Sequence, residues 1–392
     1  MASDSYDLIV VGLGAMGAAV AYHAAKLGLS VLGIDQYDPP HDLGSTKAET
    51  RITRLAVGEG PQYLPFVKRS HEIWRELEAD TGVELLHECG GIIITEQEPV
   101  PGQRWEDFVV ETERIAQLGQ IPFQVKAPAT VRAEHRWIAV PDDRNAGFEP
   151  TAGLVMAERA VEVQLARARE LGATIRTNEP VEAVEPHDDH VVVRSAGGTY
   201  QAANVVLATG PWFSELAQPE HGAQVTVTRQ VVYWFEVDDP DAFTTDTIPF
   251  VMWIARRDED YIGLFPIPPG GTPAVKILGE QFLETTNART VDREVSQAEI
   301  DTFYEVHVAP KFSGITPTCI RTAVCLYTNT ADDHFLIDHD PRSKRITVMS
   351  PCSGHGFKHS TALGQAVAQQ IATGTSTYDL SPFRTRPPNC NT

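Results

Sequence analysis

The chain has 392 residues, of which 42% are hydrophobic, so it is long enough to bury a large core and to form about two or three domains. It carries 53 acidic against 32 basic residues, a formal net charge of −21. That charge repels phosphate backbones and anionic lipids, which excludes nucleic acid and membrane surfaces as partners. The longest apolar stretch, from Leu8 to Ala21, is too short to span a bilayer and follows acidic residues, so we expect a cytoplasmic protein.

The first 35 residues predict a βαβ unit. An apolar run from Leu8 to Val11 is followed by a glycine turn, an alanine-rich helix that ends near Gly28, and a second strand that ends at Asp35. Such a unit brings free N–H groups at the helix start close to the turn, where they attract the pyrophosphate of a dinucleotide.

Three glycines in this turn fit the dinucleotide fingerprint, because they occupy positions 12, 14 and 17. Gly12 permits the tight turn, Gly14 lets the backbone approach a pyrophosphate, and Gly17 lets helix and strand pack closely. Asp35 would accept hydrogen bonds from ribose hydroxyls. The fingerprint fits FAD and NAD equally, which leaves an NAD-dependent dehydrogenase and a non-catalytic dinucleotide-binding protein open as alternatives.

Later segments predict a mixed α/β fold in which the nucleotide domain is discontinuous. The segment "NVVLATGPW" (204–212) begins with a strand-like run before "ATG". This run lies far from the glycine turn along the chain and would join the same sheet as the βαβ unit. Stretches at 90–97 and 225–237 are rich in branched and aromatic residues and predict a separate antiparallel sheet. We therefore expect a Rossmann-like FAD-binding domain from 1–88, 150–217 and 323–385, and a substrate domain from 89–149 and 218–322.

Two segments bring lysines into unusual surroundings. Lys276 lies in the otherwise apolar strand "AVKILGE", where the ordinary expectation is a side chain that reaches the surface. The stretch "SGHGFKHSTALGQ" begins at Ser353 and places glycines, histidines and Lys358 before an apolar helix that starts near Ser360. The positive N-terminal end of that helix would face an anionic group.

The cysteines and acidic clusters give weaker signals. Five cysteines form no CxxC pair, which favours reduced thiols. The acids and histidines of "DDHFLIDHD" (332–340) fit the ends of strands as well as a metal site, and we expect no metal.

Three segments together resemble the monomeric sarcosine oxidase and N-methyltryptophan oxidase family of flavoproteins. They are "DPPHDLGSTKAETRITRLAVGEG" (38–60), "CLYTNTADDHFLID" (325–338) and "SGHGFK" (353–358), and the resemblance covers nearly the whole chain. It implies a monomer that binds FAD covalently and oxidises the C–N bond of a secondary amino acid to an imine. Oxygen would be the acceptor and hydrogen peroxide the second product.

The resemblance also implies a role for each site residue. Cys325 matches the flavin-linking cysteine, Lys276 the lysine beside flavin N5 where oxygen reacts, and Arg51 an arginine over the flavin face. Arg54 and Lys358 match the residues that hold the substrate carboxylate. Without the resemblance, Glu49, Arg51 and Arg54 fall within about one and a half helical turns and favour an exposed, ion-paired turn. The further cofactor contacts expected are Gly12, Gly14, Gly17, Asp35, Ser45, Thr50, Gly354, His355 and Gly356.

Several positions depart from the family pattern, and most of them concern substrate recognition. Gly263 or Leu264 stands where a tyrosine is expected, with Tyr261 displaced, and Glu280 replaces a histidine four residues after Lys276. A carboxylate at 280 suits a cationic or polyhydroxylated substrate group, as in the related fructosyl amino acid oxidases. The sequence therefore predicts retained chemistry with an altered substrate pocket, and a fructosyl amino acid oxidase is the alternative.

Overall fold

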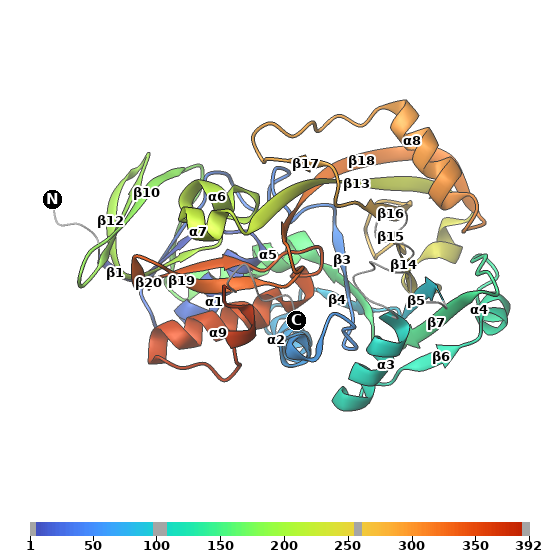
Figure 1. Ribbon diagram of the computed structural model, residues 1–392, viewed down its shortest axis with the longest axis horizontal. Coiled ribbons are helices and arrows are strands. Elements are labelled where there is room, and N and C mark those ends of the chain that lie inside the picture. Colours follow the sequence, from blue (N-terminus) through green and yellow to red (C-terminus); the bar gives the residue numbers. More distant parts are fainter. Residues whose placement is uncertain (1–4, 97–107, 255–260, 386–392) are drawn as a thin grey trace.

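The computed structural model describes residues 5–96, 108–254 and 261–385, and within them the strands form two large sheets and one small one. Figure 1 shows the sheet built around β1 at one end and the sheet built around β13 at the other. The helices are α1 (Ala15–Lys26), α2 (Leu64–Thr81), α3 (Phe108–Gly119), α4 (Pro128–Glu134), α5 (Ala157–Glu170), α6 (Phe213–Leu216), α7 (Pro219–Gly222), α8 (Gln297–Phe303) and α9 (Ser360–Thr373).

The first sheet has a parallel centre. β1 lies between β12 and β2 and is parallel to both, and β20 is parallel to β12 on its far side. Its strands, in the order of the chain, are β1 (Ser5–Val11), β2 (Val31–Ile34), β9 (Thr174–Arg176), β10 (Val181–Pro186), β11 (Val191–Ser195), β12 (Gly198–Leu207), β19 (Leu336–Asp340) and β20 (Ser343–Ser350). The expected return of the strand before "ATG" to the glycine turn is confirmed, because Leu207 pairs with Val11.

Helices α1 and α9 pack closely against each other beside this sheet. At Gly364 of α9 an added Cβ would lie 2.5 Å from the Cβ of Ala19 in α1, so small side chains set the separation of the two helices. The expected helix start at Ser360 is confirmed, and the predicted mixed α/β fold with a discontinuous Rossmann-like part is confirmed.

The second sheet is antiparallel except where β14 runs parallel to β5. Its strands are β5 (Gly91–Glu96), β6 (Gln124–Lys126), β7 (Arg144–Glu149), β13 (Val225–Val237), β14 (Phe250–Ile254), β15 (Tyr261–Phe265), β16 (Val275–Glu280), β17 (Thr285–Thr286) and β18 (Ile315–Thr330). We expected the nucleotide domain to resume at residue 323, but β18 stays paired with β13 as far as Thr330. The strand carrying Cys325 therefore belongs to the second sheet.

A small sheet connects the two large ones and corrects a second expectation. It consists of β3 (Thr50–Thr53), β8 (Gly153–Met156) and β4 (Leu86–Glu88). Arg51 lies in β3, opposite Val155, and Arg54 follows directly. The alternative of an exposed helical turn is thus wrong, because pairing with a strand about a hundred residues away holds this segment extended.

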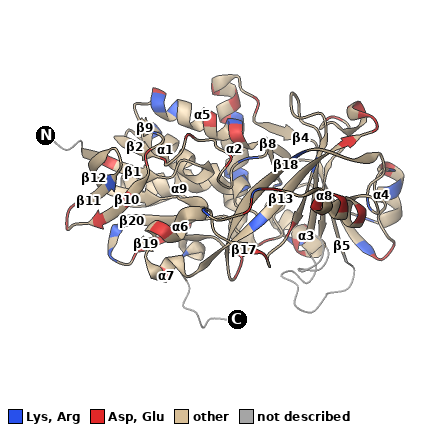
Figure 2. Ribbon diagram, turned by 90° about the horizontal axis from the view of Figure 1, so that it is seen from above, with Lys and Arg blue, Asp and Glu red and all other residues tan. Residues whose placement is uncertain are grey.

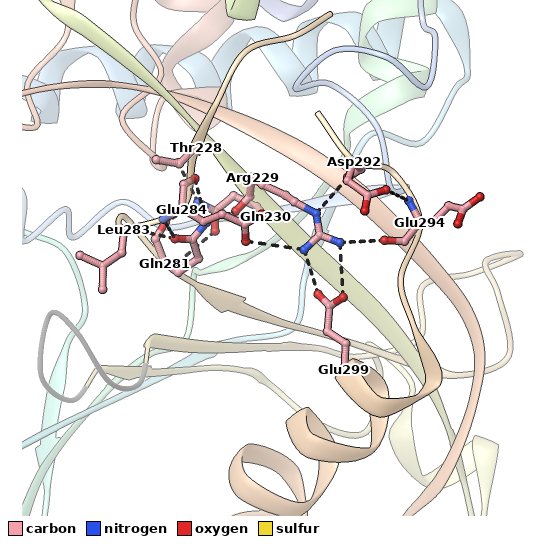
Figure 3. Close-up of polar contacts among 9 residues, drawn as sticks. All are labelled: Thr228, Arg229, Gln230, Gln281, Leu283, Glu284, Asp292, Glu294 and Glu299. Carbon is pink, nitrogen blue, oxygen red and sulfur yellow. Dashed lines mark hydrogen bonds and ion pairs between the residues drawn. The ribbon is translucent and has the colours of Figure 1, made fainter. Parts of the chain in front are cut away.

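Arg229, a buried arginine of β13, donates hydrogen bonds to the segment after β16 on the outer face of β13 (Figure 3). Arg229 donates from Nε to the Asp292 carbonyl at 2.9 Å, and from its terminal nitrogens to the Glu294 carbonyl at 3.0 Å and Glu299 Oε1 at 2.9 Å. Its neighbour Gln230 points to the opposite face of the strand, because side chains alternate along β13.

Acidic and basic residues are dispersed along the ribbon in both halves of the molecule (Figure 2). Among the described residues, no helix combines the length and the apolar character that crossing a bilayer requires.

Candidate active site

A cavity of about 560 Å³ lies between the two large sheets and is lined by residues of both. It extends from the glycine turn after β1 to the lysines of β16 and of the turn before α9. Most of the expected site residues line it: Gly12, Gly14, Asp35, Ser45, Arg51, Arg54, Lys276, Glu280, Cys325, Gly354, His355, Gly356 and Lys358. The structure thus brings together residues that are up to 346 positions apart, from Gly12 to Lys358. Gly17 and Thr50 do not line the cavity.

The glycine turn has the geometry that a dinucleotide requires. At Gly12, with φ +87°, an added Cβ would lie 2.5 Å from the Ala208 carbonyl oxygen, and at Gly17 it would lie 1.7 Å from the Gly12 carbonyl oxygen. At Gly14 the nearest atom would be Thr46 Oγ1 at 3.6 Å, so the cavity side of this residue stays open. Gly12 and Gly17 therefore serve the packing of the turn, and Gly14 leaves room for a ligand.

Asp35 lies at the same end of the cavity and holds the turn together. Its carboxylate accepts hydrogen bonds from the amides of Leu13 at 2.7 Å and Tyr37 at 2.8 Å. Burial raises the pKa of Asp35, although these two amides oppose the shift. The carboxylate is 6% exposed and lines the cavity, where ribose hydroxyls could donate to its remaining lone pairs.

Cys325 projects from β18 into the cavity, opposite Gln230 of β13, and is 3% exposed. The described cysteines are all free thiols. Cys352 also lines the cavity, and its sulfur accepts a hydrogen bond from the Thr328 amide at 3.4 Å. Two thiols thus face the cavity from different segments.

Lys276 is buried in β16 instead of reaching the surface. Its ammonium donates to the Ala48 carbonyl at 2.8 Å, the Thr50 carbonyl at 2.7 Å and Thr50 Oγ1 at 2.6 Å. It also lies 4.1 Å from the centre of the Phe265 ring. Burial and then the neighbouring Arg51 lower the pKa of Lys276 well below its ordinary value. Three acceptors nevertheless match the three protons of the charged form.

Arg51 also lines the cavity and is anchored by backbone carbonyls. Its terminal nitrogens donate to the Thr50 carbonyl at 2.8 Å and the Ser45 carbonyl at 2.7 Å. Ser45 in turn donates from Oγ to the Leu326 carbonyl at 2.6 Å, which ties this loop to the strand of Cys325. The loop and the strand are therefore positioned together.

Arg54 and Lys358 are held together by a carboxylate that sequence reasoning missed. Glu59 pairs with Arg54 at 2.7 Å and with Lys358 at 3.0 Å, and all three side chains line the cavity. Burial alone would raise the pKa of Glu59. Arg54, Lys358 and His355 lower it by more, so the pKa of Glu59 lies well below its usual range. Burial lowers the pKa of Lys358 to about 8 against the opposing effect of Glu59.

The turn before α9 is built to approach the cavity closely. Ser353 and Gly354 have φ of +43° and +77°, and a Cβ at Gly356 would lie 1.7 Å from the Pro351 carbonyl oxygen. The His355 ring lies against Phe335, with centroids 4.7 Å apart, and its Nε2 is 3.1 Å from the Asp333 carbonyl oxygen. Backbone therefore forms this part of the cavity wall.

Glu280 lies at the cavity end of β16, opposite Tyr261 of β15. Tyr327, two residues after Cys325, donates its hydroxyl to Glu280 Oε1 at 2.9 Å. Burial and then Glu280 raise the pKa of Tyr327 well above its usual value. Gly263 also faces the cavity, so the wall beside Glu280 carries no side chain there. Glu59 and Tyr327 were both within the segments that carried the resemblance.

In the ranges that the structure covers, no group of three histidine, cysteine or acidic side chains is placed to hold a metal ion.

Comparison with known proteins agrees with this geometry. The sequence model of a family described as FAD dependent oxidoreductase matches residues 7–370. A monomeric sarcosine oxidase of Bacillus sp. (strain NS-129) is 33% identical over 389 residues, covering 97% of this chain and 96% of its own. An N-methyl-L-tryptophan oxidase of Yersinia pestis (strain Pestoides F) is 34% identical over 386 residues, covering 96% and 98%.

The fold has solved relatives as well. The structure of NikD, described as an unusual amino acid oxidase essential for nikkomycin biosynthesis, superposes with a TM-score of 0.83 at 21% identity and covers 98% of each chain. The glycine fingerprint alone left FAD and NAD open, and the family match decides for FAD. The resemblance inferred from the sequence motifs is therefore confirmed, and the chain belongs to the FAD-dependent oxidoreductases that include the monomeric sarcosine and N-methyltryptophan oxidases.

Proposed function

We propose that this protein is an oxidase of secondary α-amino acids, which converts the C–N bond to an imine with oxygen as acceptor. The names of its relatives, sarcosine oxidase and N-methyl-L-tryptophan oxidase, support this substrate class. The residues of the cavity support it independently, because they supply an anchor for a carboxylate and a separate buried cation.

The cavity suits FAD on the evidence of its own residues. Gly12, Gly14 and Asp35 would hold the nucleotide end, and backbone of the turn at 353–358 would meet the ring. The thiol of Cys325 would form a thioether to the flavin. FAD, when bound, supplies the acceptor for a hydride equivalent and passes the electrons on to oxygen.

The two buried cations that meet at Glu59 are the observation that carries the proposal. Arg54 and Lys358 bring two positive charges into a buried part of the cavity, and Glu59 supplies one negative charge. Glu280 also acts on Lys358, and Glu149 on Arg54. A substrate carboxylate would bind between the two cations, where their charges are shielded from water and an anionic partner is favourable. The planar guanidinium of Arg54 is suited to bind such a carboxylate with two hydrogen bonds.

Lys276 would act in oxygen reduction. Its buried ammonium is held rigidly by three acceptors, so it offers a preorganised positive charge where negative charge develops as oxygen is reduced. Arg51, fixed by two carbonyls, would add to the positive potential over the flavin face.

A fructosyl amino acid is the second candidate substrate, and Glu280 favours it. Its carboxylate lies in the cavity wall beside Gly263, where a substrate group larger than a methyl could enter. Hydroxyl or ammonium groups of such a substrate could donate to Glu280, which Tyr327 holds in place.

A peroxide-coupled screen tests the proposed function. The purified yellow protein is offered sarcosine, N-methyltryptophan, pipecolate, proline and fructosyl amino acids in air. We expect peroxide with at least one of them, and replacement of Arg54 by methionine should raise KM far more for the amino acid than for the corresponding amine without a carboxylate. A colourless protein, or one that forms no peroxide with any N-substituted amino acid, would contradict the proposal.

We also propose that the enzyme acts as a monomer in the cytoplasm, in line with its charge and the name of its sarcosine oxidase relative. Gel filtration of the flavin-loaded protein tests the first part.

A further inference from the structure

Two consecutive residues beside the cavity adopt a backbone conformation that glycine would favour. Ala48 and Glu49 have φ of +71° and +64°, and neither is glycine. The left-handed conformation costs such residues roughly 1–2 kcal/mol each. Ala48 is 1% exposed, so surrounding contacts must hold the turn in this form. Backbone strain of this kind is often found where it serves function.

This turn presents the acceptors that orient Lys276. The carbonyl of Ala48 accepts from the ammonium at 2.8 Å, and Thr50, the residue after the turn, contributes its carbonyl at 2.7 Å and its hydroxyl at 2.6 Å. If the turn relaxed to negative φ, the carbonyls at 48 and 50 would point elsewhere. The position of the Lys276 ammonium therefore depends on the conformation of the turn.

The carboxylate of Glu49 ties the turn to three other segments. Oε1 accepts from Thr272 at 2.5 Å and from Arg321 at 2.7 Å, and Oε2 accepts from the indole of Trp234 at 3.3 Å. Trp234 is the direct neighbour of Lys276 across the β13–β16 pair. The carboxylate and the ammonium are thus fixed to the same part of the second sheet, although Glu49 does not line the cavity.

Glu49 also balances the charge around Lys276. The charged and titratable groups that act on the ammonium are Arg51, Glu49, Cys325 and Glu158. Arg51 lowers the pKa of Lys276, whereas the carboxylates raise it. Loss of the Glu49 charge would leave the cation of Arg51 less opposed.

We infer that Glu49 is a positioning residue for oxygen reduction, which holds the strained Ala48–Glu49 turn and thereby places the ammonium of Lys276. The inference rests on the role of Lys276 in the proposed function. It assigns to Glu49 no contact with substrate or flavin.

Separate measurement of the two half-reactions tests the inference in Glu49→Gln, which removes the charge and keeps the shape. We expect anaerobic reduction of the flavin by substrate to stay within two-fold of the unaltered enzyme and reoxidation by oxygen to slow at least ten-fold. Because the ammonium would lose its proton more easily, the reoxidation rate should also begin to fall at a lower pH. Lys276→Met alone and the double variant should reoxidise equally slowly, because both residues act through the same group.

A matched control removes another carboxylate that accepts hydrogen bonds from a side chain of β13. Glu299→Gln takes away the partner of the buried Arg229 on the outer face of β13 (Figure 3). It should lower thermal stability without slowing reoxidation. If Glu49→Gln does not fold, Thr272→Val removes one of the three donors to Glu49 and should slow reoxidation two- to five-fold.

A crystal structure of Glu49→Gln gives a readout independent of activity, and we expect at least one of the three Lys276 hydrogen bonds to exceed 3.5 Å. Unchanged reoxidation, or equal slowing of both half-reactions, would overturn the inference. Failure of the proposed function has a different signature, since then no N-substituted amino acid would reduce the flavin of the unaltered enzyme.

Discussion

Raising the pH through the titration of Lys358 should weaken the binding of a carboxylate. Burial lowers the pKa of this lysine to about 8, so the ammonium that pairs with Glu59 is lost as the pH rises above that value. Methoxyacetate is a suitable ligand, because it has the carboxylate and the shape of sarcosine but no titratable amine. Its binding therefore reports on the protein groups alone.

The size of the effect follows from the pKa. About nine-tenths of Lys358 is charged at pH 7 and about one-tenth at pH 9. Without the ammonium, only the ion pair of Arg54 and Glu59 remains, and one of the two cations that attract the carboxylate is gone. The Kd for methoxyacetate should thus be nearly flat below pH 8 and rise by up to about ten-fold per pH unit above it.

Stability should change in the opposite direction over the same range. An unfolded chain keeps its lysines charged up to about pH 10.4, so between about pH 8 and 10 it binds more protons at position 358 than the folded protein does. The contribution of Lys358 to the free energy of unfolding therefore rises with pH while ligand binding weakens.

The assay is a titration of the flavin absorbance with methoxyacetate between pH 6 and 10, with Lys358→Met as control. The control should bind weakly at every pH, without the inflection near pH 8. An inflection that persists in Lys358→Met would refute the reasoning, and so would a Kd that is constant to pH 10 in the unaltered enzyme.

Three further predictions concern the cofactor and the pocket. Cys325→Ser should release its flavin on acid precipitation, whereas mass spectrometry of the washed unaltered polypeptide should show FAD attached. Flavin that stays attached in the variant would contradict the role of this thiol as the covalent link. Gly17→Ala should unfold at a lower temperature even without FAD, because its Cβ would lie 1.7 Å from the Gly12 carbonyl, and Gly14→Ala should keep that stability but show a lower flavin-to-protein ratio. Glu280→Gln should lower kcat/KM at least ten-fold for cationic or polyhydroxylated substrates and less than three-fold for sarcosine, and equal losses would exclude a role in specificity.

The glycine turn could be predicted from sequence because its constraints are local. Gly12 and Gly17 are five residues apart, and the clash that excludes a side chain at Gly17 involves Gly12 itself. The same holds for the start of α9, which follows a glycine turn directly. In both cases the spacing of residues close together in the sequence is enough to predict the local structure.

Residues whose roles depend on distant partners could not be found in this way. Glu59 gains its importance from Lys358, 299 positions later, and the extended conformation of β3 depends on β8 about a hundred residues away. The local pattern of charges at 49, 51 and 54 favoured an exposed helical turn, because residues spaced by three positions lie on the same face of a helix. Only the sheet pairing distinguishes the helical turn from the strand.

The two groups of buried charge follow one rule. Arg54 and Lys358 are accompanied by Glu59, and Arg51 and Lys276 lie beside Glu49. Each group also has a second carboxylate, because Glu280 acts on Lys358 and Glu158 acts on Lys276. Two bare cations would repel each other strongly in a cavity of low polarity. The two cations at each place therefore suit the two negative charges that the proposed reaction brings in, the substrate carboxylate at one end and the oxygen species under reduction at the other.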